Sequence, residues 1–408
     1  MNRVRIHKRE IDIMNWKLVL GILTANVLFM SSSYTMLIPF LPMYLTLELG
    51  VPESDVNIWS GIVFSASFVM SAVMAPIWGK LADKKGKRLM AIRASFLLSI
   101  SYFLGGIVQT PEQLALMRLF QGFAAGLWPM ELAIMSLYSP PDKLGVCIGI
   151  LQGVLTAGSV IGPLIGGILA EYFGMRASFY LAAGALFVNC LAFVFVIKEP
   201  PAPEAPSHSP KKDQSSFSLL RRPVIATLLC ASALVQMVIL ILQPILTTYI
   251  SSLAGELPNL VLVSGIVFSL GGIAGAAAAP CWGWFGQHNG FVRAMLMAML
   301  LGGCSLIVQG TMTELYSFAA MQFVCGLFFC GIHPSLNSLL AKCTEPSVKG
   351  QIFGLMFAAQ QIGSILGPIL GGVVATYFGM HSVFFAAGAV LIFMSLTLRV
   401  NRKRLPAA

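Results

Sequence analysis

The chain has 408 residues, of which 57% are hydrophobic and only 10% are charged. A soluble globular chain carries roughly 25% charged residues, and charged side chains are costly at bilayer depth, so this composition excludes an ordinary soluble domain. The formal net charge is +10, but the positions of the basic residues, described below, relate it to membrane orientation and not to nucleic-acid binding.

Eight cysteines are scattered through the chain without paired spacing, a CxxC motif or histidines in a ligand pattern. Most lie within apolar stretches, where a cysteine acts as a small buried side chain. We therefore expect no disulfide, no metal site and no cofactor.

Twelve apolar segments follow one another along the chain, each near the roughly 20 residues that a helix needs to cross a bilayer. The first follows a basic stretch, as in a signal peptide, but its apolar run from Leu18 to Leu45 is too long and lacks a cleavage site, so we expect a retained helix. Only helices fit, because unpaired backbone groups cannot face lipid. The predicted spans are 17–45, 57–81, 89–109, 113–138, 144–170, 177–198, 223–250, 260–285, 291–311, 314–341, 349–375 and 382–400.

Basic residues are concentrated on one side of this arrangement. With the N-terminus inside the cell, all of the 26 Lys and Arg residues except Arg118 and Arg176 fall on cytoplasmic ends or loops, as the positive-inside rule requires. An even number of spans then places both termini in the cytoplasm, and we expect a multi-pass protein of the cell (inner) membrane. The opposite loops carry acidic residues instead: Glu48, Glu53, Asp55, Glu112, Glu171, Glu256 and Glu314.

The chain divides into two related halves, residues 1–198 and 223–408, joined by a polar linker at 199–222 that we expect to be flexible and cytoplasmic. Residues 61–79 match 265–283 at an offset of 204, and residues 158–175 match 363–380 at an offset of 205. Such a duplication predicts an all-helical membrane protein with two pseudo-symmetric six-helix halves and a substrate site between them near the middle of the membrane.

A charged loop follows the second span and reads GKLADKKGKR from Gly79 to Arg88. It resembles the loop signature of the major facilitator superfamily, with Asp83 as its carboxylate, Gly86 as its turn glycine and Lys87 among its cations. The resemblance implies a conformational switch whose ion pairs form in one state and break in another; an ordinary basic loop is the alternative. The second half keeps the glycines but has no counterpart of Asp83, so any such switch is asymmetric.

The fifth span carries a glycine pattern that resembles the antiporter motif of the same superfamily. Glycines at four-residue spacing make a flat face where helices approach closely, and a proline permits a bend. Generic small-residue packing is the alternative, because the eleventh span carries the same pattern through the duplication. The residues are Gly158, Gly162, Pro163, Gly166 and Gly167.

Two further patterns extend the resemblance over nearly the whole chain. Arg118, followed by Gln121 and Gly122, resembles the R-x-x-q-G motif, and Pro39 with Pro42 is similar to the P-x-x-P end of the first helix in twelve-helix drug–proton antiporters. The resemblance is closest to the multidrug efflux branch of that family. It implies proton-coupled export by alternating access.

Two charged residues lie well inside apolar segments. Glu131 is the only such acid, and a lone buried carboxyl can take up a proton because its charged form is poorly solvated, which a proton-coupled carrier requires. The alternative is that Glu131 lies at a water-filled cytoplasmic vestibule and has no coupling role. Arg118 is a functional candidate because intramembrane ions usually are; a structural arginine that reaches the outer surface is its alternative.

Arg118 and Glu131 cannot pair directly on a continuous helix. They are 13 residues apart, roughly 20 Å of rise and about 140° in projection, although Pro129 can rotate the lower segment. His333 lies at a similar depth in the tenth span, where Pro334 matches Pro129 at an offset of 205, and it can titrate near neutral pH. We expect these three residues to form the proton-coupling set, with a structural hydrogen-bonding role as the alternative for His333.

Spans 1, 4, 7 and 10 resemble the cavity lining of the family. Their aromatic and methionine side chains give adaptable apolar contacts, which suits small amphipathic compounds; packing or lipid-facing roles are the alternative. The substrate-binding candidates are Tyr34, Met36, Trp128, Met130, Gln236, Gln243, Phe329 and Asn337.

These features predict a secondary active transporter and not an enzyme. We expect a monomeric proton-coupled antiporter that exports small amphipathic compounds or drugs, with the lipid bilayer, protons and the substrate as its partners and no nucleic acid. One alternative is an exporter or symporter of one defined metabolite such as a sugar, although inward symport would need more polar residues in the cavity. Another is a non-transporting membrane sensor, which would need an extramembrane domain larger than 199–222.

Tags test this orientation. We expect a tag at either terminus, or within 199–222, to be reached only from the cytoplasm, because basic residues flank these segments. Antibody labelling of intact and permeabilised cells measures this, with a tag beside Glu53 as the control that intact cells should expose. Labelling of a terminal tag on intact cells would contradict the predicted orientation.

Overall fold

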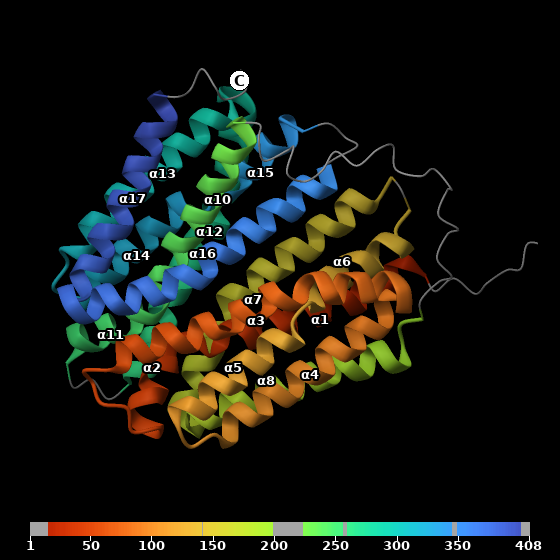
Figure 1. The fold of residues 1–408 in the computed structure, drawn as a ribbon, viewed down its shortest axis with the longest axis horizontal. Coiled ribbons are helices and arrows are strands. Elements are labelled where there is room, and N and C mark those ends of the chain that lie inside the picture. Colours follow the sequence, from red (N-terminus) through yellow and green to blue (C-terminus); the bar gives the residue numbers. More distant parts are fainter. Residues whose placement is uncertain (1–14, 141, 199–222, 256–258, 345–348, 401–408) are drawn as a thin grey trace, which may run out of the picture.

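The computed structural model describes residues 15–140, 142–198, 223–255, 259–344 and 349–400, and the regular elements within these ranges are all helical (Figure 1). Eleven helical stretches are long and apolar enough to cross a membrane. The remaining span is the pair α5 (Pro111–Ala124) and α6 (Leu127–Tyr138), which a break leaves in two short pieces. The all-helical fold with twelve spans is therefore confirmed, whereas the linker 199–222 lies outside the described residues.

The charged ends of the helices give the molecule two distinct faces. We call one face the basic end; the described residues that define it are Lys80, Lys84, Lys85, Lys87, Arg88, Lys143, Lys198 and Lys342. We call the opposite face the acidic end; it carries Glu48, Glu53, Asp55, Glu112, Glu171 and Glu314.

Eight spans are continuous helices of two lengths. The shorter ones have 20 or 21 residues: α4 (Lys87–Ile107), α8 (Met175–Phe195), α13 (Phe291–Gly310) and α17 (Met380–Val400). The longer ones have 30 residues: α3 (Val56–Lys85), α7 (Leu144–Phe173), α12 (Leu260–Asn289) and α16 (Lys349–Phe378). A helix of 30 residues is about 45 Å long, so each of these extends beyond a hydrocarbon core of roughly 30 Å or crosses it at a tilt.

The other four spans are interrupted part-way. The first consists of α1 (Trp16–Met36), the 3₁₀ turn η1 (Ile38–Phe40), α2 (Leu41–Met43) and the π-turn η2 (Tyr44–Glu48). Its counterpart in the second half is α10 (Pro223–Ile241) with α11 (Gln243–Ala254), and α5 with α6 corresponds to α14 (Leu315–Phe329) with α15 (Ile332–Lys342). The breaks fall at repeat-related positions, since Met36 and Ile241 differ by the same offset of 205 as Ala124 and Phe329.

The break in the fourth span corrects the predicted continuous helix at 113–138. The helix stops at Ala124 and restarts at Leu127, with Gly126 at a φ of 115° between them. Pro129, which was expected to rotate the lower segment of the span, lies in the first turn of α6, where proline is tolerated. It acts four residues earlier, because it has no N–H to donate to the carbonyl of Ala125.

The two halves each have their own apolar core and meet through long helices. Buried side chains of α1 to α8 form one cluster, which Val261 of α12 joins, and those of α10 to α17 form another. Across the boundary, α3 packs on α16 and α7 packs on α12. The Ser65 hydroxyl donates to the Ile365 carbonyl over 2.8 Å, and Ser269 donates likewise to Val160 over 2.8 Å.

Glycines show that the halves are closed at the acidic end and apart at the basic end. A Cβ built on Gly61 would lie 2.5 Å from the Pro368 carbonyl oxygen, and one on Gly265 would lie 2.5 Å from that of Pro163. Both contacts lie in the acidic-end portions of their helices. In the basic-end portions of the same four helices, a Cβ would meet nothing within 4 Å at Gly79, Gly145, Gly149, Gly153, Gly283 and Gly354. In Figure 1 the first half (red to yellow-green) and the second half (green to blue) accordingly meet near α2 and α11 and diverge toward α6 and α15.

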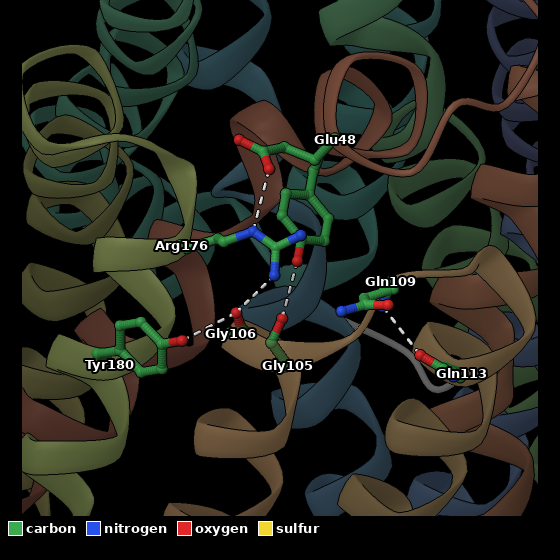
Figure 2. A network of polar contacts seen from close by, with 8 residues as sticks. Glu48, Gly105, Gly106, Gln109, Gln113, Arg176 and Tyr180 are labelled. Atoms are coloured by element: carbon green, nitrogen blue, oxygen red, sulfur yellow. Dashed lines mark hydrogen bonds and ion pairs between the residues drawn. The ribbon is translucent and has the colours of Figure 1, made fainter.

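A polar network explains why Arg176 lies at the acidic end, away from most other basic residues. Its Nε donates to Glu48 over 3.0 Å, and its Nη1 donates to the Gly106 carbonyl over 2.8 Å, which also accepts from the Tyr180 hydroxyl (Figure 2). The Tyr44 hydroxyl donates to the neighbouring Gly105 carbonyl. Arg176 thus neutralises an acid and satisfies carbonyls at the end of α4, so its charge does not conflict with the charge rule.

The second half repeats this network with a different side chain. His381 stands at the offset of 205 from Arg176, and Tyr249 stands at the same offset from Tyr44. Nδ1 of His381 lies 2.8 Å from the Gly310 carbonyl oxygen and 3.0 Å from the Tyr249 hydroxyl, which itself donates to Met312. The carbonyls at the ends of α4 and α13 are therefore contacted by corresponding side chains in the two halves.

Replacement of a contact glycine tests the closed acidic end. Gly265→Ala should lower the free energy of unfolding by about 1–3 kcal/mol, because the added methyl group overpacks against the Pro163 backbone. Gly283→Ala on the same helix is the matched control and should be neutral or slightly stabilising, since nothing lies within 4 Å of its Cβ. Thermal unfolding of both variants in detergent measures the difference, and equal melting temperatures would contradict this packing.

Candidate functional site

Glu131 lies on the face of α6 that packs into the first half. This face is formed by a buried stripe at helical spacing: Leu127, Glu131, Ile134, Met135 and Tyr138. Within the described residues, α6 packs mainly on α1, α4 and α7. Glu131 is 0% exposed, and neither of its carboxyl oxygens has a hydrogen-bond partner. In this conformation the residue is not in a water-filled vestibule.

Arg93 holds the break that precedes Glu131. Its Nη2 donates to the Ala125 carbonyl over 2.9 Å, and its guanidinium lies 3.7 Å from the centre of the Trp78 ring. Trp78 in turn donates from Nε1 to the Phe123 carbonyl over 2.8 Å. Two carbonyls near the end of α5 therefore receive side-chain donors in place of helical ones, as a buried backbone requires.

The sequence interpretation missed Arg93, because it was counted among the cations at helix ends. Its position within the predicted span 89–109 was the available signal. The second half keeps the tryptophan alone: Trp282 donates to the Leu327 carbonyl over 2.7 Å. At the offset of 204 that relates these tryptophans, Arg93 corresponds to Met297, which lines an apolar pocket together with Trp282.

Arg118 is buried in the same half, on the other side of the break. It is 3% exposed, donates to the Gln121 side chain over 2.9 Å and lies 5.8 Å from the centre of the Phe64 ring. The phenols of Tyr34 and Tyr102 lie within electrostatic range of its charge. Its Nε has no hydrogen-bond partner. The arginine therefore does not reach the outer surface, and Glu131 is not among its partners.

His333 is not brought near Glu131. It is the second residue of α15, half-buried, and α15 packs on α10, α12, α13 and α14 of the second half. Of the three predicted proton-coupling residues, only Arg118 and Glu131 share one half, and the break in their span separates them.

The predicted substrate-binding residues differ in exposure. Tyr34 is 38% exposed although it lies well inside the first span, and Arg118 is near it. Met36 is 3% exposed, because its backbone lies against Gly166. The other six are half-buried: Trp128, Met130, Gln236, Gln243, Phe329 and Asn337. Buried side-chain oxygens of Gln243 and Asn337 have no hydrogen-bond partner, so both amides retain binding capacity.

Comparison with known proteins identifies the fold. The family model of the Major Facilitator Superfamily matches residues 23–308 and 261–408. The chain belongs to this superfamily. Multidrug resistance protein MdtG of Proteus mirabilis is 32% identical over 93% of this chain and 94% of its own length, and MdtG of Klebsiella pneumoniae is 31% identical over 97% and 95%.

Solved structures with low sequence identity share the same fold. The nucleoside transporter NupG has a TM-score of 0.78 at 17% identity, over 96% of this chain and 100% of its own. A bacterial homolog of the human lysosomal transporter Spinster, solved in an inward-facing and occupied conformation, has a TM-score of 0.79 at 15% identity, over 96% and 98%. The matched proteins are transporters, so the superfamily assignment also excludes an enzyme.

The antiporter-like glycines of this superfamily member hold α7 against the first span. A Cβ on each would strike α1: Gly158 meets Ser31, Gly162 meets Thr35, and Gly166 meets Met36. Gly167 instead faces Leu262 across the boundary between the halves. The second half repeats the pattern, with Gly363, Gly367 and Gly371 against α10 and Gly372 against Asn57. The motif therefore packs one half internally, while Pro163 and Gly167 face the other half across the boundary.

The carboxylate of the superfamily loop signature is exposed in this conformation. Gly86, at a φ of 95°, ends α3 and precedes α4. Asp83 is 80% exposed and lies 3.9 Å from Lys87. Arg88 donates to the carbonyls of Phe193 and Val194, which attaches α4 to the end of α8. With the basic end open, Asp83 thus forms an exposed pair and not a buried latch.

Asp83→Asn tests whether the signature acts in another state. We expect an unchanged melting temperature, because an exposed ion pair contributes little stability, together with a several-fold slower transport rate and a KM within a few-fold. The measurement is uptake of a fluorescent amphipathic dye into inverted vesicles. Asp142→Asn is the matched control, since Asp142 forms a similarly exposed pair with Lys143 at 3.7 Å. Wild-type rates in Asp83→Asn would remove it from the transport cycle.

Proposed function

We propose that this protein is a proton-coupled antiporter that exports small amphipathic compounds by alternating access. Its superfamily membership and its similarity to two multidrug resistance proteins over more than 90% of the chain support export of such compounds. The observation that carries the proton coupling is the carboxyl of Glu131, which is fully buried and has no hydrogen-bond partner.

The carboxyl meets the requirement for coupling. A carrier can drive one flow with another only if its states differ in affinity for both ligands. An unpaired carboxylate in an apolar interior is expensive, so Glu131 is stable there as the neutral acid and needs water or a cation when it ionises. A conformational change that alters its access to water therefore changes its affinity for a proton.

The orientation of the basic end sets the direction of this cycle. By the positive-inside rule the basic end faces the cytoplasm, and the present conformation is then open toward the cytoplasm, where an exported compound enters. The two halves between which an exported compound would pass belong to one chain, which supports a monomer. Protons would enter from the acidic end after the halves close at the basic end.

The predicted substrate-binding side chains suit a cargo with a large apolar surface. Tyr34, Trp128, Met130 and Phe329 offer aromatic and thioether contacts that adapt to different shapes. None of the substrate-binding candidates is charged, and Arg118 lies near Tyr34. A sugar, which requires many hydrogen bonds, fits this composition less well.

Glu131→Gln tests the proposal, because it keeps the size and hydrogen-bonding capacity of the side chain and removes its charge. We expect the variant to bind dye and to exchange it down a gradient, but to lose accumulation driven by an imposed pH difference in inverted vesicles. Glu112→Gln is the control on the same span, since Glu112 is exposed at the acidic end, and it should accumulate dye normally. Accumulation by Glu131→Gln at the wild-type level would show that another group carries the proton.

A further inference from the structure

Two oppositely charged residues of the first half both have unsatisfied polar atoms. Nε and Nη1 of Arg93 are buried without a hydrogen-bond partner, and so are Oε1 and Oε2 of Glu131. Arg93 is on α4 and Glu131 is on α6, and these helices contact each other. Buried polar atoms are nearly always paired, so two donors and two acceptors left open on adjacent helices need an explanation.

The capping role of Arg93 does not explain its charge. Pro129 cannot donate to the Ala125 carbonyl, and one N–H of Arg93 replaces the missing donor. A neutral donor would suffice, as Trp78 shows by donating to the Phe123 carbonyl of the same break. In the described part of α13, no charged residue lies between Ala294 and Gly310, so the second half has no counterpart of this cation.

The break places the guanidinium beside the start of α6, the helix that carries Glu131. Arg93 Nη2 binds Ala125, directly before α6, and it lies 3.5 Å from the Cβ position of Gly126. Glu131 is four residues after Leu127 on the same buried stripe, about 6 Å further along the axis. Side chains of a helix lean toward its N-terminus, and this is the end of α6 at which Arg93 is held.

Arg93 is also the only charged residue part-way along the described portions of the helices packed on α6. The charged residues of α1, α4 and α7 otherwise lie near their ends: Lys17, Lys87, Arg88 and Glu171. The polar group that α1 offers at this depth is the neutral Asn26, whose Nδ2 has no hydrogen-bond partner. Among these helices, Arg93 is therefore the cation placed to stabilise an ionised Glu131.

We propose that Arg93 is the charge partner of Glu131 and changes its hydrogen bonds when that residue loses its proton. With Glu131 protonated, Arg93 donates to the Ala125 carbonyl, as observed. When Glu131 releases its proton to water at the basic end, the guanidinium turns to the carboxylate and leaves the Ala125 carbonyl. The break in the fourth span is then no longer held, and α6 is free to change its angle to α5.

Arg93 is on this account a positioning residue that acts through Glu131 and the break. Its relevance to transport rests on the proposed function, whereas the switch itself needs only the two side chains. A test without cargo or gradient therefore separates the switch from the proposed function. If the protein did not export drugs, the titration of Glu131 would still test the switch. If the switch failed, export coupled to another proton site would remain intact.

Infrared titration of the full-length protein in lipid tests the switch. The carbonyl band of a protonated carboxyl, assigned to Glu131 by its absence in Glu131→Gln, is followed from about pH 4 to pH 10. Arg93→Gln keeps a donor for the Ala125 carbonyl but removes the charge, so the midpoint should rise by at least about one pH unit, a tenfold higher proton affinity. Arg93→Lys keeps the cation and should titrate close to wild type.

The control is Trp282→Phe, which removes a carbonyl donor at the equivalent break of the second half and should leave the midpoint unchanged. If Arg93 were only a helix cap, Arg93→Gln would also leave it unchanged, and this result would overturn the proposal. A wild-type Glu131 that does not titrate in this range would overturn it as well. If Arg93→Gln does not fold, Arg93→Met serves as the second uncharged variant with the same expectation.

Discussion

The need to satisfy backbone groups away from water determines the interior of this protein. A lipid-embedded helix that breaks leaves carbonyls without donors, and four of the twelve spans break. Trp78 and Trp282 each donate to a carbonyl near such a break, and Arg93 takes the place of the amide that Pro129 lacks. The side chains that permit the breaks are therefore as important to the architecture as the glycines that bring helices together.

Departures from the internal symmetry coincide with the candidate site. Packing is repeated almost residue for residue, as in the contacts of Gly61 with Pro368 and of Gly265 with Pro163. Charge is not repeated. The first half has charged residues where the second has neutral ones: Asp83 corresponds to Gln287, Arg93 to Met297, Arg118 to Gln322 and Glu131 to Leu336. Gln322 forms a neutral amide pair with Gln309, so the second half has a polar but uncharged interior at that position.

Hydropathy and duplication predicted the spans and the two-half architecture, because each depends on composition over roughly 20 residues or more. They did not predict where the fourth span breaks. Pro129 marks the region, but the displaced hydrogen bond belongs to a residue four positions earlier. Arg93 was missed for a related reason: a cation six residues into a helix looks like an end residue until its side chain is seen to reach a neighbouring break. The prediction that Arg118 and Glu131 do not pair needed only helical geometry.

The distribution of charge in the first half has a consequence for alternating access. Arg93 and Arg118 stay charged at any physiological pH. When Glu131 is protonated, this interior holds two uncompensated cations; when Glu131 is ionised, its carboxylate compensates one of them. The protonated state is electrostatically the less balanced of the two, and it gains most from a conformation that gives a cation access to water or to an acceptor group of a cargo. The ionised state gains most from a closed interior in which carboxylate and guanidinium meet. One proton can therefore favour opposite conformations of a scaffold whose two halves are otherwise packed alike.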